Sequence, residues 1–120
     1  MKHLTTEEII LIHNKLIKEF GGEEGIVDRD KLDFIADKVQ SSKADVFRKA
    51  AMLLHDIATI HPFVDGNKRT AIETAKVFLR ENGKTLNLKD INQAAEYIYS
   101  VAEDKKNIFS IENWIKQHCD

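Results

Sequence analysis

Apolar residues in the first part of the chain recur at the three- and four-residue spacing of an amphipathic helix. The first such stripe ends at Gly21 and Gly22, and Thr5 and Glu8 form a capping-box pattern ahead of it. Its members are Ile9, Ile10, Ile12, Leu16, Ile17 and Phe20. The pattern predicts a first helix that starts after Thr5 and ends at the glycine pair.

Two more helices are predicted before the middle of the chain. After Gly25, either Asp28 or Asp30 can cap a helix whose apolar residues fall on one face. These residues are Leu32, Ile35, Ala36 and Val39. Residues 44–60 are apolar on more than one face, which predicts a central, buried helix. Pro62 ends it, because the residue before a proline avoids the helical region.

The helical pattern continues in the second half. A fourth helix is expected to begin near Asn67 and to stop at Gly83, a residue type favoured just after a helix. Asp90 can cap a fifth helix over residues 91–103. Its inward positions are predicted to be Ala94, Ala95, Ile98 and Val101.

Ser110 can cap a sixth helix over residues 111–118, with Trp114 and Ile115 inward. Residues 84–88 allow a short strand, but strands and helices do not alternate as a doubly wound sheet requires. We therefore predict the all-α class, with a single compact bundle of about six helices.

Composition and charge narrow the function classes. With 120 residues, 42% apolar and 32% charged, the chain is too apolar for a disordered protein and suits one domain over residues 1–120. A net charge of -2 disfavours nucleic acid as a partner, and with it a small DNA-binding regulator. Cys119, the single cysteine, excludes an intrachain disulfide, and no apolar run suggests a signal peptide or a membrane span. We expect a cytoplasmic protein.

The chemically informative stretch is residues 61–69, with the sequence HPFVDGNKR. A helix that starts within it directs free backbone N–H groups and its positive dipole end into the loop. Asn67, Lys68 and Arg69 add side-chain donors, and such a cluster suits phosphate oxygens. Asp65 is a hard oxygen ligand placed where Mg²⁺ can bridge protein and phosphates.

His61 can accept a proton from an incoming hydroxyl as a general base, the role that histidine fills most often in catalysis. Phe63 is expected to fill the core and fix the turn. Each feature also has a structural interpretation, since Asp65 can cap a helix and His61 can simply end one. Their convergence on one loop favours Mg-nucleotide chemistry. A Walker-type loop matches less well, because the upstream glycine and the preceding strand are missing.

Residues 61–69 closely resemble the Fic/Doc (Fido) signature H-x-F-x-[DE]-G-N-[GK]-R. The glycine turn at residues 21–25, Asp28 and the sequence VFLRENG at residues 77–83 are similar to the death-on-curing (Doc) branch. The resemblance implies a Fido fold that uses ATP and Mg²⁺ to modify a Ser or Thr hydroxyl of a protein target. It assigns these roles: general base His61, Mg²⁺ ligand Asp65, structural anchor Phe63, and an ATP-phosphate nest of Gly66, Asn67, Lys68 and Arg69.

Two positions differ from most Fic adenylyltransferases. Lys68 stands where they have glycine, and Ile72 stands where they have a second arginine. The lysine adds a point charge and bulk, and the missing arginine removes a bidentate phosphate clamp. The resemblance then favours Doc-like phosphoryl transfer. Gly66 is the commoner Fic residue, so AMP transfer stays an alternative, as does an inactive module that binds nucleotide or a partner.

The family's inhibitory motif, [ST]-x-x-x-E-[GN], is missing, because the three Glu-Gly or Glu-Asn pairs of the chain lack the required Ser or Thr. The resemblance therefore implies a toxin inhibited in trans by an antitoxin. Its suggested target is elongation factor Tu or its archaeal counterpart. Residues 41–60 are fewer than we expect where Doc-like chains carry a target-docking flap.

The pair His55-Asp56 resembles the metal ligands of HD-type phosphohydrolases. That site needs further ligands, and His13 and His118 are the available candidates. A packed helical histidine is the simpler interpretation.

Overall fold

Six helices make up the described chain. The computed structural model describes the backbone of residues 1–120 and every side chain except that of Ile91. The helices are α1 (Thr6–Phe20), α2 (Arg29–Ser41), α3 (Val46–Ile60), α4 (Asn67–Glu81), α5 (Ile91–Ala102) and α6 (Ile108–His118). Within these residues β-pairing is limited to two isolated bridges, one from Ile26 to Phe63 and one from Leu86 to Cys119. The predicted all-α bundle is confirmed, and residues 84–88 contribute only a bridge.

The helix starts follow the predicted capping residues. Thr5 and Glu8 form the reciprocal capping box of α1. Asp28, rather than Asp30, caps α2, and Asp90 caps α5 as expected.

The predicted start of the last helix is wrong. α6 begins one turn earlier, at Ile108, because the side chain of Asn107 accepts a hydrogen bond from the Ser110 backbone N–H at 2.8 Å. Asn and Ser are comparable N-caps. The earlier start also brings Ile108 against the core, alongside the fully buried Ile111.

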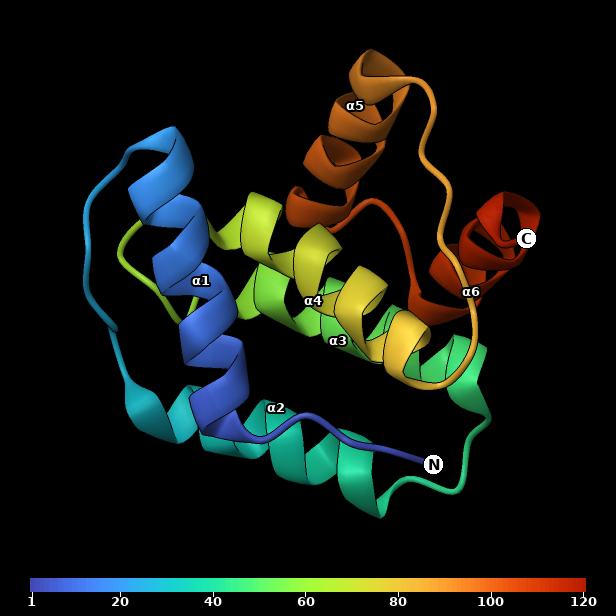
Figure 1. Ribbon diagram of the computed structural model, residues 1–120, viewed down its shortest axis with the longest axis horizontal. Helices are drawn as coiled ribbons and strands as arrows, with labels where there is room; N and C mark the ends of the chain where they lie inside the picture. Colours follow the sequence, from blue (N-terminus) through green and yellow to red (C-terminus); the bar gives the residue numbers. More distant parts are fainter.

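α3 is the central helix of the fold. It contacts α2, α4, α5 and α6, and Figure 1 shows it beside α4 in the middle of the molecule. Its buried positions cover most of its circumference, which confirms the predicted central helix. Fully buried alanines at positions 50, 51 and 58 leave room for close helix contacts.

The prediction that Ala95 points inward is wrong. Ala94, Ile98 and Val101 are buried, at the i, i+4, i+7 spacing of one narrow stripe, whereas Ala95 is exposed. A single stripe suffices because α5 packs on the core along one side only.

The His55-Asp56 pair serves the fold. Asp56 is buried, and its carboxylate oxygens lie 2.9 Å from His55 Nδ1 and 3.0 Å from Lys38 Nζ, which joins α2 to α3. Burial opposes ionisation of Asp56, but the hydrogen bonds from His55 and Lys38 outweigh it and lower its pKa. No cluster of three metal-ligating His, Cys, Asp or Glu side chains occurs among the described residues. These contacts support the packed-histidine interpretation.

Replacing His55 with glutamine is expected to reduce stability more at low pH than at high pH. The hydrogen bond to Asp56 raises the pKa of His55 above 6.5, so its stabilisation is complete below pH 6.5 and is lost as pH rises through the folded-state pKa. One such hydrogen bond stabilises by about 1 kcal/mol, or about 4 °C in Tm, at about pH 5.5. Thermal denaturation of both proteins at low and high pH measures the effect, and an equal difference at both would contradict it.

Candidate functional site

The loop between α3 and α4 has a residue in the left-handed backbone conformation at each end. His61 ends α3 with a φ of 57°, and Gly66 starts α4 with a φ of 78°. Phe63, between them, is 1% exposed and belongs to the core, as the sequence predicts. The loop is therefore anchored at its centre and turns sharply at each end.

Asn67 closes this loop. Its side-chain oxygen accepts from the Phe63 backbone N–H at 3.0 Å, and its side-chain N–H donates to the Phe63 carbonyl at 2.9 Å. The predicted role of Asn67 in phosphate binding stays a prediction. The loop uses the amide oxygen and one amide N–H, so Asn67 can offer a phosphate its second amide N–H and its backbone N–H.

Asp65 is exposed and held by two backbone groups. Its Oδ1 accepts from the Gly66 N–H at 2.8 Å, and its Oδ2 accepts from the Glu23 N–H at 3.1 Å. These two hydrogen bonds, that from Glu23 foremost, lower the pKa of Asp65, so the carboxylate is charged at neutral pH. A fixed, ionised and accessible carboxylate is a suitable Mg²⁺ ligand.

A second segment, residues 21–28, lies along the loop. The Val27 N–H donates to the Pro62 carbonyl at 2.8 Å, and the Val64 N–H donates to the Gly25 carbonyl at 3.0 Å. Both hydrogen bonds join backbone atoms, so no pattern of residue types in the sequence predicts this pairing. In the stretch 41–60, where the family resemblance suggested a docking flap, Ser41 ends α2, residues 42–45 form a short connector and residues 46–60 form α3.

The N-terminus of α4 opens toward a pocket. Gly66 provides no side-chain cap, and the first backbone hydrogen bond of the helix is from Thr70 to Gly66 at 3.0 Å. The N–H groups of residues 67–69 therefore have no acceptor within the helix. The adjoining pocket has a volume of about 640 Å³ and lies between α1, α4 and α5. Such a helix end, facing a cavity, suits an anion.

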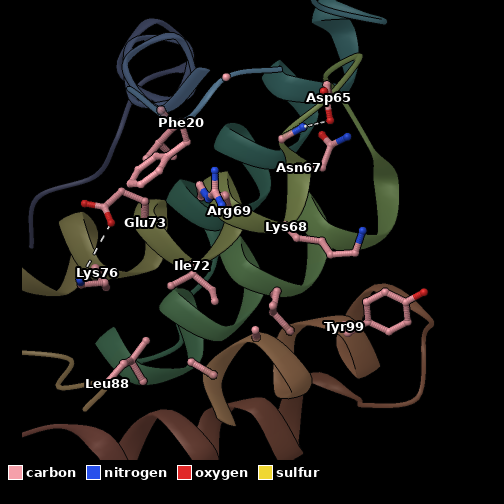
Figure 2. Close-up of a pocket in the computed structure, with 16 residues that line it drawn as sticks. Phe20, Asp65, Asn67, Lys68, Arg69, Ile72, Glu73, Lys76, Leu88 and Tyr99 are labelled. Atoms are coloured by element: carbon pink, nitrogen blue, oxygen red, sulfur yellow. Dashed lines mark hydrogen bonds and ion pairs between the residues drawn. The ribbon is translucent and has the colours of Figure 1, made fainter. Parts of the chain in front are cut away.

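Two cations at this helix end lie over exposed aromatic rings. Arg69 Cζ lies 4.3 Å from the ring centre of Phe20, and Lys68 Nζ lies 5.4 Å from that of Tyr99. Figure 2 shows Phe20 and Tyr99 at different edges of the pocket, with the two cations between them. The aromatic faces hold both charges at the pocket rim.

The His61 side chain is exposed and is not among the described side chains that line the pocket. The pocket lining brings together Asp65, Gly66, Asn67, Lys68 and Arg69, and His61 begins the loop that leads to them. A left-handed conformation is uncommon for a residue with a side chain, and such residues gather at functional sites.

His13 has a structural role at the site that the sequence did not predict. This side chain of α1 is fully buried, and its ring stacks on Phe63 with centroids 3.8 Å apart. Its Nε2 lies 2.8 Å from the backbone oxygen of Asp65. The available signal was its position, one helical turn from Ile9 and from Ile17 on the apolar face.

Comparisons with known proteins bear on this arrangement. Residues 3–79 match the model of the Fic/DOC family. The chain is 31% identical over 122 residues to "Protein kinase doc" of Escherichia phage P1, an alignment that covers 98% of this chain and 95% of that protein. It is 38% identical over 94 residues to "Toxin Doc" of Mycolicibacterium smegmatis, covering 73% and 67% of the two chains. The family match includes the whole loop described above.

Proposed function

The chain belongs to the Fic/DOC family, and on that premise we propose that it is a Doc-like toxin that transfers a phosphoryl group from Mg-ATP to a Ser or Thr hydroxyl of a protein. The observation that carries the proposal is the uncapped N-terminus of α4, which combines an ionised carboxylate and two cations beside a pocket of about 640 Å³. These are the groups that a metal-bound polyphosphate requires.

The residues present fit Mg-ATP. Mg²⁺ is commonly held by one or two carboxylates, with water and phosphate oxygens as its other ligands, so Asp65 alone can supply the protein's share. The backbone N–H groups of residues 67–69 and the cations of Lys68 and Arg69 would hold the phosphates. When bound, Mg²⁺ offsets the negative charge of the phosphates.

His61 would accept the proton of the target hydroxyl. The hydroxyl oxygen then forms a bond to the γ-phosphorus, the bond from that phosphorus to the β–γ bridging oxygen breaks, and ADP leaves. Exposure of the His61 ring suits a base that must meet a protein substrate from solvent.

The orientation of the nucleotide decides which group is transferred. Ile72 lines the pocket where a second arginine would add a phosphate clamp, and Lys68 adds bulk at the helix start. Both favour γ-phosphoryl transfer. Gly66 is explained by its left-handed backbone and by the 3.1 Å that would separate an added Cβ from Ile17 Cδ1. Its presence therefore gives no support to AMP transfer.

Incubation with ATP labelled at the α or the γ phosphate tests the proposal. Label from the γ position in a protein of a cell extract is the expected result. Label from the α position would replace phosphoryl transfer by AMP transfer, and label from neither, with folded protein, would contradict both.

An antitoxin and an elongation factor are the proposed partners. The pocket extends beyond the phosphate-binding end as an apolar surface, which suits a segment of an antitoxin. That surface is lined by Leu16, Ile72, Leu88, Ala94 and Ile98. Co-expression with the protein of the neighbouring small reading frame should suppress toxicity, and unchanged toxicity would contradict this partner. The target proposed from the family resemblance is elongation factor Tu or its archaeal counterpart, to be identified by mass spectrometry of the labelled protein.

Gly22→Ala is expected to reduce the transfer rate about tenfold or more, because displacing the Asp65 carboxylate would misplace the proposed metal ligand. An added Cβ at Gly22 would lie 2.8 Å from Asp65 Oδ2 and would displace the carboxylate. Gly21→Ala is the matched control, since Gly21 also has positive φ but nothing lies within 4 Å of its added Cβ. Initial transfer rates and thermal stability of both variants separate displacement from backbone strain, and equal rates would contradict the expectation.

A further inference from the structure

The imidazole of His13 lies directly beneath the loop that carries Asp65. It is 0% exposed, and its ring is within 2° of parallel to Phe63. Its Nε2 lies 2.8 Å from the Asp65 carbonyl oxygen, and its Nδ1 lies 3.1 Å from Asn14 Oδ1. Nε2 and one ring face are therefore used by the Asp65 carbonyl and by Phe63.

The contact of His13 with Asp65 involves the Asp65 backbone carbonyl and not its side-chain carboxylate. A carbonyl oxygen only accepts, so Nε2–H is the donor. An added Cβ at Gly66 would lie 3.7 Å from the same Nε2, which places the imidazole against the Asp65–Gly66 peptide. This peptide joins the candidate metal ligand to the start of α4. Its orientation sets both the Asp65 carboxylate and the first free N–H groups of the helix.

Packing alone does not explain a histidine here. Burying an imidazole costs more than burying an apolar ring unless its polar atoms are hydrogen-bonded. A phenylalanine would stack on Phe63 equally well and would be easier to bury. What only a polar side chain supplies at this position is the hydrogen bond to Asp65.

We propose that His13 is a positioning residue of the transfer reaction, which holds the Asp65–Gly66 peptide so that the carboxylate and the α4 N-terminus face the same phosphates. This role rests on the proposed function. His13 does not contact the reacting groups and acts through the loop.

Two variants separate the hydrogen bond from the stacking. His13→Gln keeps a donor near Nε2 and loses the ring, whereas His13→Phe keeps the ring and loses the donor. We expect His13→Phe to be the more stable of the two and to lose about tenfold in kcat, the effect of one hydrogen bond. We expect His13→Gln to be less stable yet to stay within about threefold of the wild-type kcat. If His13 were purely structural, the more stable of the two variants would also have the higher kcat.

Amide hydrogen exchange supplies a readout without nucleotide. Protection of the Gly66 N–H, which donates to Asp65, should fall in His13→Phe and persist in His13→Gln. Unchanged protection and wild-type kcat in His13→Phe would overturn the inference. If His13→Phe does not fold, His13→Leu takes its place. It loses both the ring and the donor, and the same losses in kcat and in Gly66 N–H protection are expected of it. Wild-type protein that transfers no label contradicts the proposed function instead, and the exchange experiment still decides whether His13 holds the loop.

Discussion

His61→Gly is expected to lose at least about 100-fold in transfer rate while becoming slightly more stable. The loss follows from removing the proposed general base, whose proton transfer contributes a factor of that size or larger. The gain follows from the backbone, since His61 has a φ of 57° at the end of α3, where glycine is the favoured residue.

The gain in stability is small. A left-handed conformation costs a residue with a side chain about 1 kcal/mol, and the greater freedom of glycine in the unfolded chain offsets part of this. We expect a net gain of about 0.5 kcal/mol, or about 2 °C in Tm. Stability and activity would then change in opposite directions, which distinguishes the variant from a damaged fold.

Asp104→Gly is the matched control. Asp104 is the other described residue with a side chain and a positive φ, 59°, and it is not among the described residues that line the pocket. It should leave transfer unchanged and gain less stability, because Asp104 Oδ1 lies 3.6 Å from His55 Nε2 and this ion pair is lost. Calorimetry and γ-phosphate labelling measure both effects, and wild-type transfer by His61→Gly would refute the assignment of the base.

The helices could be predicted from the sequence because their signals are local. The period of apolar residues and the capping pairs, such as Thr5 with Glu8, reside within one or two turns of chain. The sequence does not locate the start of α6, because Asn107 and Ser110 are both good N-caps and only the packing of Ile108 selects between them.

The loop was located from the sequence, but its internal roles were not. A run of Asp, Gly, Asn, Lys and Arg at a helix start identifies polar groups that can bind a ligand. It does not show which of these groups form hydrogen bonds within the protein. The Asn67 side-chain amide makes two hydrogen bonds to the Phe63 backbone, and His13 lies beside Asp65, 52 positions away in the sequence. The pairing of residues 21–28 with the loop is made by backbone atoms, which carry no residue-type pattern.

Asp65→Asn is expected to reduce transfer at least about 100-fold, even at high Mg²⁺, because a neutral amide oxygen is a weaker Mg²⁺ ligand than a carboxylate. The substitution also replaces one acceptor by an NH₂ group. The side chain can then satisfy only one of the N–H groups of Gly66 and Glu23, which the carboxylate satisfies together at 2.8 and 3.1 Å.

These two consequences can be separated. Asp28→Asn removes the same charge from the neighbouring segment, and asparagine remains a good N-cap for α2, so transfer should stay at the wild-type rate. Gly22→Ala displaces the carboxylate but keeps its charge, so part of its lost activity should return as Mg²⁺ is raised, whereas that of Asp65→Asn should not. Titration of the transfer rate with Mg²⁺ for all three variants makes this comparison. Full recovery of Asp65→Asn at high Mg²⁺ would show that Asp65 serves the loop rather than the metal.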